Sequence, residues 1–342
     1  MKLKRYAKNP ILSPDPKSSW ESAYTCNPAA WYDGKRFYLL YRAGPDDDVH
    51  PIYFGLAEST DGFHFRRADT KPVFGPSENG FDGGCIEDPR IIKIGEVFYV
   101  TYAARMTPPG PYWKKTMPLN AYTPKFFQNG SSPAAAKWNL TRSGLAATTD
   151  FRKWYRLGPI TGATLDDRDA IIFPDRVDGK FAMLHRPSSW VGPEYGCDKP
   201  SMWISFSDDL LSWSSEHLLA SPAFDWEGHK IGGSAPPIKT ERGWLTLYHG
   251  VDNEFRYCVG AMMLDLKNPL NILGRTPAPI LEPETDYEMN GIVPNVVFPC
   301  GNVVVGEELY VYYGAADKYC GVATCKLGEL VDHVLSNPWK GK

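Results

Sequence analysis

Five segments of the chain repeat one plan, and this repeat limits the possible folds more than any other feature. Each segment has a proline, an apolar stretch, a glycine turn and an alternating apolar strand, which together predict a β-hairpin. The turns Asp33-Gly34 and Asp178-Gly179 are strong hairpin signals. The segments are NPAAWYDGKRFYLLYRA (27–43), EDPRIIKIGEVFYVTYAA (87–104), FPDRVDGKFAMLHRP (173–187), APPIKTERGWLTLYHGVD (235–252) and FPCGNVVVGEELYVYYGAAD (298–317).

A second, weaker pattern follows each hairpin and predicts two more strands. It occurs as GLAESTDGFHF (55–65), GLAATTDFRKW (144–154), ISFSDDLLSW (204–213), VGAMMLD (259–265) and GVATCKL (321–327). Four strands repeated five times predict an all-β protein, a five-bladed β-propeller that forms a single domain over residues 1–342. An irregular β-sandwich is the alternative. Helical periodicity is nearly absent.

One long insertion interrupts the repeat in or after the second blade. The turn glycines are spaced 61 to 64 residues apart, except for the 84 residues between Gly95 and Gly179. The excess lies at 105–141 and is rich in proline and aromatic residues, which argues for an ordered segment. It is either a surface flap or oligomer contact, or a wall of the substrate site. In the second case the rings available to a sugar are Tyr112, Trp113, Tyr122 and Trp138.

Composition excludes several classes of function. The net charge of −3 offers no basic excess for nucleic acid, and no apolar run is long enough for a membrane helix. The first residues lack the apolar stretch of a signal peptide. The seven cysteines show no CxxC spacing, and the histidines show no metal-binding spacing. We therefore expect a cytoplasmic protein with buried free thiols and no metal or cofactor.

Charged residues recur at matching places near the ends of the repeats. In a propeller such positions converge on a central funnel, where several cations would form a site for an anion such as phosphate. Scattered surface ion pairs are the alternative interpretation. The cations or potential cations are Arg42, Arg168, Arg186, Lys230 and His249, and the other polar residues at these places are Glu87, Asp88, Arg90 and Asp317.

Several of these runs resemble glycoside hydrolase family 130. The runs are GGCIEDPRI (83–91), DFRKWYRLGPI (150–160), FPDRVDGKFAMLHRP (173–187), WEGHKIGGSAPPI (226–238), GWLTLYHGVD (243–252) and YYGAAD (312–317). The likeness extends from about residue 5 to 325 and is weakest in the insertion. The family consists mainly of inverting β-mannoside phosphorylases on a five-bladed propeller, and it also includes β-1,2-mannosidases.

The resemblance implies a role for each charged residue. Asp88 matches the general acid, and the proton is expected to pass through the mannose 3-hydroxyl. The residues expected to hold phosphate are Arg168, Arg186, Lys230 and His249. Those expected to hold the mannosyl unit are Arg42, Arg90 and Asp317. Inorganic phosphate is then a co-substrate, and the products are α-D-mannose 1-phosphate and a shortened acceptor. Candidate substrates are β-mannosyl-glucose, β-mannosyl-N-acetylglucosamine and β-manno-oligosaccharides.

The charge pattern also fits this chemistry directly. An inverting hydrolase needs an acid and a base, whereas an inverting phosphorylase needs only the acid, because phosphate is already nucleophilic. One acid facing four cations therefore favours phosphorolysis. Asp88 must be protonated before the reaction, and its pKa would be raised by Glu87 and lowered by Arg90. A β-mannosidase that uses water and a non-catalytic glycan-binding propeller are the alternatives. The acceptor, the linkage and any homo-oligomer are left open.

Overall fold

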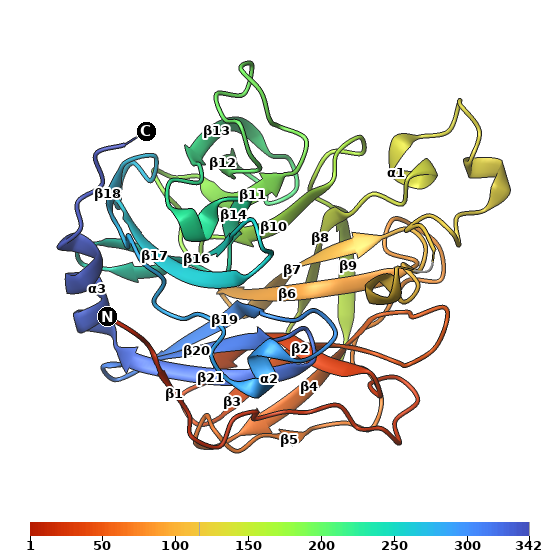
Figure 1. Cartoon of the computed structure of the whole chain (residues 1–342), viewed down its shortest axis with the longest axis horizontal. Coiled ribbons are helices and arrows are strands. Elements are labelled where there is room, and N and C mark those ends of the chain that lie inside the picture. The colour runs from red at the N-terminus through yellow and green to blue at the C-terminus, as the bar shows by residue number, and fades with distance from the viewer. Residues whose placement is uncertain (116, 342) are drawn as a thin grey trace.

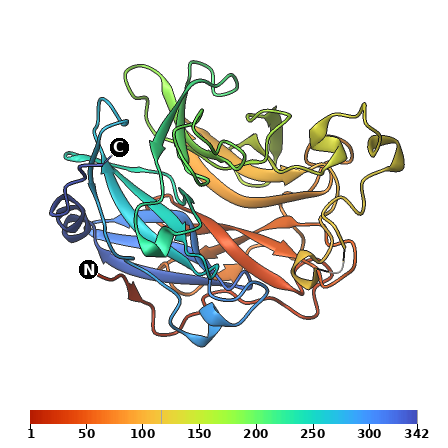
Figure 2. The same ribbon diagram turned by 45° about the horizontal axis from the view of Figure 1, so that its top comes forward.

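The structure, a computed structural model, describes residues 1–115 and 117–341. Five antiparallel sheets are arranged in a ring as the blades of a propeller (Figures 1 and 2). The innermost strand of blade one, β2, packs against the inner strands of both neighbouring blades, β6 and β19. The five-bladed β-propeller predicted from the repeats is thereby confirmed.

The blades follow the order of the chain, from an inner strand to an outer one. Blade one contains β2 (Tyr24–Tyr32), β3 (Phe37–Gly44), β4 (Tyr53–Ser59) and β5 (Arg66–Arg67). Blade two contains β6 (Cys85–Ile94), β7 (Val97–Arg105), β8 (Arg142–Thr148) and β9 (Trp154–Pro159). Blade three contains β10 (Asp167–Ile172), β11 (Phe181–Pro187), β12 (Met202–Ser207) and β13 (Ser214–Ala220).

The last two blades depart slightly from this plan. Blade four has a broken inner strand, because β14 (Lys230–Gly233) and β15 (Ile238–Thr240) both pair with β16. Its other strands are β16 (Gly243–Val251), β17 (Tyr257–Leu264) and β18 (Ile272–Arg275). Blade five contains β19 (Val297–Val305), β20 (Glu308–Ala315), β21 (Tyr319–Lys326) and β1 (Lys4–Arg5).

The first two strands of each blade meet at the predicted glycine turns. Gly34 and Gly179 have φ angles of 95° and 80°, in the region that glycine adopts without a steric penalty. The strands that follow these turns alternate so that their aliphatic and aromatic side chains pack between neighbouring blades. One such cluster joins blades one and two through Leu40, Phe54 and Val100.

A buried side-chain cluster recurs in four blades, and we call it the blade clamp. A tyrosine near the end of the second strand donates its hydroxyl to a carboxylate that precedes the inner strand, and an arginine on the outer strand binds the same carboxylate. The four blade clamps are Tyr41–Glu21–Arg67, Tyr102–Asp82–Arg156, Tyr248–Glu227–Arg275 and Tyr313–Glu288–Arg5. These carboxylates are 0 to 3% exposed, so in four blades the clamp connects a buried carboxylate near the inner strand to an arginine on the outer strand.

The insertion at 105–141 lies within blade two, between β7 and β8. It contains the short helices η1 (Tyr112–Lys114), η2 (Lys125–Phe127) and α1 (Ala134–Lys137). Its second half projects from the ring beside blade two (Figure 1). The remaining short helices are η3 (Asp225–Glu227) and α2 (Asp286–Met289).

Like these short helices, two elements at the ends of the chain were not predicted. The N-terminal strand β1 pairs with β21 and so completes blade five. The C-terminal helix α3 (Leu327–Leu335) follows β21 directly and buries Leu330 and Val334 in the cluster that also contains Leu3. The two ends of the chain therefore close the ring together (Figure 1).

The structure also bears on two expectations from composition. No helix within residues 1–115 and 117–341 has the length and apolar character needed to cross a membrane. All seven cysteines are free thiols, and only Cys325 is not fully buried.

Candidate active site

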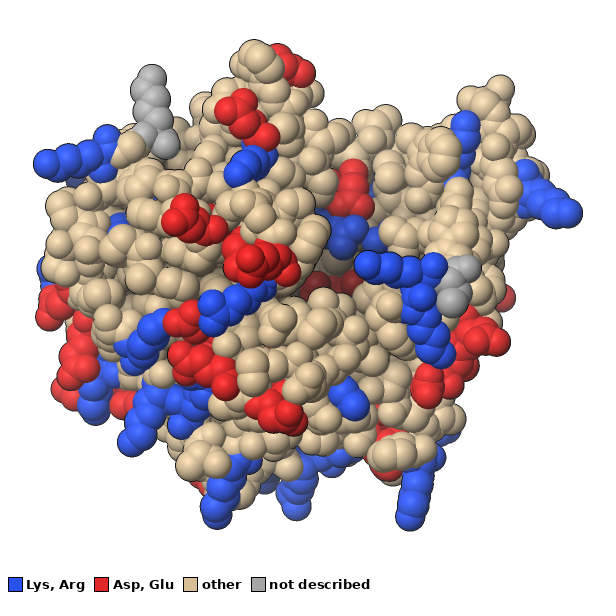
Figure 3. Space-filling view, viewed as in Figure 1, with Lys and Arg blue, Asp and Glu red and all other residues tan. Residues whose placement is uncertain are grey.

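A cavity of about 420 Å³ opens where the inner strands meet (Figure 3). Figure 3 shows acidic and basic side chains inside this hollow. Seven of the eight residues expected at the site line it: Arg42, Asp88, Arg168, Arg186, Lys230, His249 and Asp317. They come from all five blades, so the propeller brings together residues that are up to 275 positions apart in the sequence.

Backbone bulges on three inner strands turn polar side chains into the cavity. The pairing of β2, β6 and β10 with their neighbours shifts at Cys26/Ala29, Glu87/Arg90 and Arg168/Ile171. Each shift contains one residue in the left-handed region: Asn27 (φ 48°), Asp88 (φ 53°) and Asp169 (φ 56°). Asparagine and aspartate tolerate this conformation better than other residues with a side chain. The repeat therefore places one such residue from each of three blades in the cavity.

Asp88 is held by two donors on one of its oxygens. Asn27 Nδ2 donates to Asp88 Oδ1 at 2.7 Å, and Arg42 Nη1 donates to the same oxygen at 3.2 Å. Within the described residues, Oδ2 has no such partner and is the oxygen available to a substrate. Asn27 fits only because residue 314 is glycine, since a Cβ there would lie 1.7 Å from Asn27 Oδ1.

Arg42 connects Asp88 to the first half of the insertion. It lies 3.5 Å from Glu87 and donates through Nη2 to the Tyr112 hydroxyl at 2.8 Å. Burial alone would raise the pKa of Glu87, but Arg42 and Arg105 hold that pKa below its usual range. Glu87 is therefore an ionised partner of these arginines, whereas its neighbour Asp88 keeps one oxygen available to a substrate.

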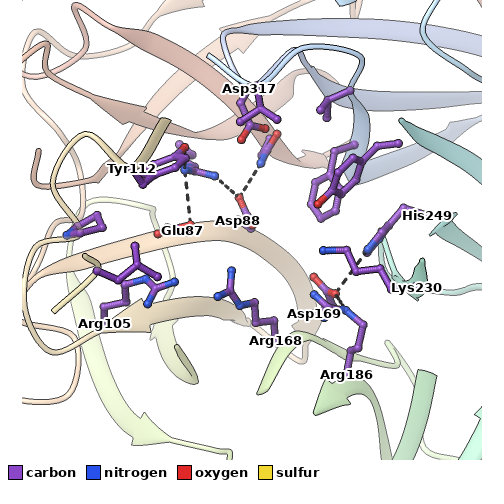
Figure 4. Close-up of a pocket in the computed structure, with 18 residues that line it drawn as sticks. Glu87, Asp88, Arg105, Tyr112, Arg168, Asp169, Arg186, Lys230, His249 and Asp317 are labelled. Atoms are coloured by element: carbon purple, nitrogen blue, oxygen red, sulfur yellow. Dashed lines mark hydrogen bonds and ion pairs between the residues drawn. The ribbon is translucent and has the colours of Figure 1, made fainter. Parts of the chain in front are cut away.

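The groups expected to hold phosphate form an arc on one side of Asp88, opposite Asp317 (Figure 4). We call this set the phosphate arc: Arg168, Arg186, Lys230 and His249. Arg168 makes two hydrogen bonds to Asp166, at 2.7 and 2.9 Å, and Arg186 binds Asp169 at 2.8 Å. Burial opposes the charge of both carboxylates, yet the neighbouring arginines hold their pKa values well below the usual range. The two arginines are thus held in place by carboxylates and still face the cavity.

Lys230 and His249 complete the arc in different charge states. Burial, together with Arg186 and Arg168, lowers the pKa of Lys230 to about 7. Burial lowers the pKa of His249 to about 3, so this imidazole is neutral at pH 7 and holds an anion only by donating a hydrogen bond. The sequence analysis included His249 among the potential cations. Because its burial keeps the imidazole neutral, the positive charge of the arc comes from Arg168, Arg186 and Lys230.

Arg90 is the one expected residue that does not line the cavity. Its guanidinium is buried and donates to the backbone carbonyls of Ser234 and Asp88, at 3.0 and 2.7 Å. It also pairs with Asp169 at 3.5 Å. Arg90 thus contacts both Asp88 and Asp169, and the sugar-binding role that the resemblance implies for it stays a prediction.

Asp317 faces Asp88 from the turn between β20 and β21. Burial raises the pKa of Asp317 to about 6, and the negative charges of Asp88 and Glu87 add to this rise against the effect of Arg42. A carboxyl with this pKa can accept or donate a hydrogen bond to a sugar hydroxyl near neutral pH.

Sequence reasoning missed several residues that line the cavity: Asn27, Arg105, Asp169, Tyr257 and Phe298. A signal for two of them was present. Asn27 precedes Pro28 as Asp88 precedes Pro89, and Asp169 occupies the corresponding place in blade three. Of the four insertion rings expected to be available to a sugar, Tyr112 lines the cavity, together with Pro109 and Leu119. The other three, Trp113, Tyr122 and Trp138, are not among the lining residues. In the part of the chain that the structure describes, no cluster of three or more His, Cys, Asp or Glu side chains could hold a metal ion.

Comparison with known proteins gives consistent matches over nearly the whole chain. The model for glycoside hydrolase family 130, described as beta-1,4-mannooligosaccharide phosphorylase, matches residues 2–120 and 134–336. Only 121–133 of the insertion lies outside this match, a shorter segment than the 105–141 expected to be least family-like. All the sequence runs that resemble the family fall within the matched residues.

Named relatives and solved structures agree with this match. A 1,2-beta-oligomannan phosphorylase of Thermoanaerobacter sp. (strain X514) is 35% identical over 339 residues, covering 96% of this chain and 99% of the relative. A beta-1,4-mannooligosaccharide phosphorylase of Ruminococcus albus is 30% identical, covering 97% of this chain and 91% of the relative. The structure of a beta-1,2-mannobiose phosphorylase from Listeria innocua, in complex with beta-1,2-mannobiose, has a TM-score of 0.79. It is 27% identical and covers 98% of this chain and 100% of its own.

Proposed function

The chain belongs to glycoside hydrolase family 130, and from that membership and the charged cavity we propose that it phosphorolyses β-mannosides with inversion. Inorganic phosphate is the second substrate, and the products are α-D-mannose 1-phosphate and a sugar shortened by one mannose. One observation carries the proposal: the arc of Arg168, Arg186, Lys230 and His249 faces Asp88 across a single cavity.

The chemistry is a single displacement at the anomeric carbon of the mannosyl unit. A phosphate oxygen attacks C1 from the side of the arc while the glycosidic C1–O bond breaks on the other side. Asp88 supplies the proton that the leaving oxygen takes up, and it is reprotonated from water before the next turnover. Arg168 and Arg186 orient the phosphate and offset its charge as it approaches the sugar.

Water is a weaker candidate for the nucleophile. Hydrolysis with inversion needs a second carboxylate free to act as a base. Two of the other carboxylates in the cavity are occupied, since Glu87 pairs with Arg42 and Asp169 pairs with Arg186. The third, Asp317, lies on the side of Asp88 opposite Arg168 and Arg186, away from where the nucleophile would approach (Figure 4). The side of the cavity where a water would be activated is instead lined by cationic groups.

We propose β-1,2-linked oligomannosides as the substrates. The more similar of the two relatives described above is named for β-1,2 oligomannan, and the solved structure is named for β-1,2-mannobiose. The relative with the lower identity is named for β-1,4-linked oligosaccharides.

The test is synthesis in the reverse direction. Purified protein is incubated with α-D-mannose 1-phosphate and one acceptor at a time: mannose, β-1,2-mannobiose, β-1,4-mannobiose, glucose or N-acetylglucosamine. We expect phosphate release with mannose or a mannobiose, and an NMR spectrum of the product that shows a new β-1,2 linkage. A β-1,4 product would correct the linkage alone. Cleavage of β-mannosides at the same rate with and without phosphate would replace phosphorolysis by hydrolysis, and no turnover in either direction would favour a glycan-binding propeller.

A further inference from the structure

Blade three lacks the blade clamp that the other four blades share. In the other four repeats the tyrosine of the clamp occupies one matching position: Tyr41, Tyr102, Tyr248 and Tyr313. In blade three this place, in the run FAMLHRP, is taken by His185. The residue that follows it, Arg186, is one of the two arginines proposed to hold phosphate.

His185 forms a different hydrogen-bonded group with two other residues of blade three. Its Nδ1 lies 2.9 Å from Asp167 Oδ2, and the Ser205 hydroxyl lies 2.7 Å from its Nε2. The three residues come from the three adjacent strands β11, β10 and β12. The carboxylate therefore belongs to the inner strand itself, whereas in the blade clamps it precedes that strand.

The order aspartate, histidine, serine is also that of a hydrolase nucleophile, but the surroundings exclude such a role here. Asp167 and His185 are each 3% exposed and Ser205 is 1% exposed. None of them lines the cavity, so no substrate carbonyl can reach the serine. The hydrogen-bonded group of Asp167, His185 and Ser205 is therefore a structural element of the sheet, and we call it the brace.

The brace lies directly behind the two arginines. Asp167 precedes Arg168 and His185 precedes Arg186, and these two arginines are opposite each other in the β10–β11 pair. The regular pairing of the strands breaks immediately afterwards, between Arg168 and Ile171. Two side-chain contacts join β10 to β11 next to this interruption: the Asp167–His185 hydrogen bond and the Arg186–Asp169 ion pair.

We propose that His185 is a positioning residue for phosphate, which acts through Asp167 and Ser205 to fix the relative placement of Arg168 and Arg186. This inference rests on the proposed function, because it assumes that these arginines bind the nucleophile. It does not require His185 to touch phosphate or sugar. Two guanidinium groups share one small anion, so a small shift between their strands weakens both contacts at once.

The test compares variants of the brace with a matched blade clamp variant. His185→Phe keeps a planar ring and removes both nitrogens, His185→Asn restores a donor toward Asp167, and Ser205→Ala removes the donor to Nε2. Tyr102→Phe is the control, because it removes one buried hydrogen bond to a carboxylate in blade two and is followed by Ala103, which does not line the cavity. For each protein we measure kcat, the KM values for phosphate and for the mannoside, and the rise in melting temperature caused by phosphate alone.

We expect His185→Phe to raise the phosphate KM by about tenfold or more, the size of effect typical of a lost bond to a charged group, with the mannoside KM nearly unchanged. Ser205→Ala should raise the phosphate KM by a smaller factor, and His185→Asn should recover most of the wild-type value. Tyr102→Phe should lower the melting temperature without changing the phosphate KM.

The inference is overturned if the brace variants lose stability as Tyr102→Phe does while their phosphate KM and phosphate-induced stabilisation stay at wild-type values. If His185→Phe does not fold, Ser205→Ala and His185→Asn decide the question by the same measurements. A wild-type protein that neither binds nor requires phosphate would instead refute the proposed function, and this is visible before any variant is made.

Discussion

The carboxyl group of Asp88 has one engaged oxygen and one that faces the cavity. Asn27 and Arg42 both donate to Oδ1, so the proton that the leaving group takes up is expected on Oδ2. The substitution Asp88→Asn keeps the size and the hydrogen bonds of Oδ1 but removes the transferable proton. We expect kcat to fall by about 10² to 10⁴-fold while the melting temperature and its response to phosphate are retained. A variant that keeps more than a tenth of wild-type turnover would remove Asp88 from this role.

Lys230 makes phosphate binding depend on pH. Its pKa is lowered to about 7 by burial and by Arg186 and Arg168, so its charge is present below pH 7 and lost above it. The phosphate KM should therefore rise as the pH increases from about 6 to 8. Lys230→Arg is the control, because arginine stays charged throughout this range. The rise in the phosphate KM of the wild-type protein should exceed that of the variant, and equal slopes would show that only the titration of phosphate is being observed.

At the scale of elements, the insertion divides into two parts. The part before residue 121 supplies Tyr112 and Leu119 to the cavity wall. Segment 121–133, which the family model does not match, supplies no residue to the wall. It is stabilised by an internal bond from Gln128 Nε2 to the Thr123 carbonyl and by a bond from the Tyr122 hydroxyl to the Asp48 carbonyl. Its Phe126 is 68% exposed. The expected substrate wall is therefore carried by the first part.

We expect replacement of 121–133 by a short Gly-Ser linker to leave both KM values within about threefold of the wild type. A short linker can span the gap because Asn120 already bonds to the carbonyl of Lys137 at 3.1 Å. The matched variant is Tyr112→Phe, which leaves a buried N–H of Arg42 unpaired and should raise the mannoside KM by about tenfold. If the deletion raised the mannoside KM more than Tyr112→Phe does, segment 121–133 and not the first part of the insertion would form the substrate wall. A change of oligomeric state on deletion, measured by light scattering, would make the segment an assembly contact.

Local sequence patterns predicted the blades because each hairpin carries its own signals. An Asp-Gly turn between apolar strands specifies a hairpin without reference to the rest of the chain, as at Gly34 and Gly179. The site was harder to predict. Asp88 and the phosphate arc were found through their places in the repeats, but Asp169 depends on a bulge. Tyr112 was one of four candidate rings in the insertion, and only the path of the loop distinguishes it from the others. Arg90 was expected at the same site, and sequence alone does not show that its side chain stays out of the cavity lining.

At the scale of the whole molecule, closure of the ring depends on the first residues of the chain. Strand β1 has only two residues, Lys4 and Arg5, paired with Ala323 and Thr324 of β21. A strand this short has no periodicity, and its partner is more than 300 positions away, so no local pattern could have predicted it. Arg5 supplies the arginine of the blade clamp in blade five, and this clamp is the only one of the four whose arginine comes from the opposite end of the chain.

Substitution of Arg5 tests how much this closure stabilises the propeller. Arg5 donates to both oxygens of Glu288, at 2.8 and 3.0 Å, and Glu288 is 0% exposed. Arg5→Ala leaves that carboxylate buried with no cation, which typically costs about 3 kcal/mol or more, less here because Arg5 itself is partly exposed. We expect a clear fall in the urea midpoint and melting temperature. The control Lys4→Ala, on the same strand and exposed, should change neither.

The pH dependence of the Arg5→Ala defect provides the decisive check. Burial alone would raise the pKa of Glu288, but the hydrogen bonds from Arg5 and the backbone hold it below its usual range in the wild type. A depressed folded-state pKa contributes stability that is present above the unfolded pKa and lost as pH falls through the folded one. Without Arg5, burial dominates and the carboxyl prefers to be protonated. The difference in the free energy of unfolding between the variant and the wild type should therefore be widest near neutral pH and narrow as the pH falls below about 5.

Adding Glu288→Gln to Arg5→Ala should recover part of the lost stability at pH 7, because a neutral amide is less costly to bury than an unpaired charge. A difference that is independent of pH and unaffected by Glu288→Gln would show that closure depends on backbone pairing of β1 with β21, and the buried ion pair would then contribute little.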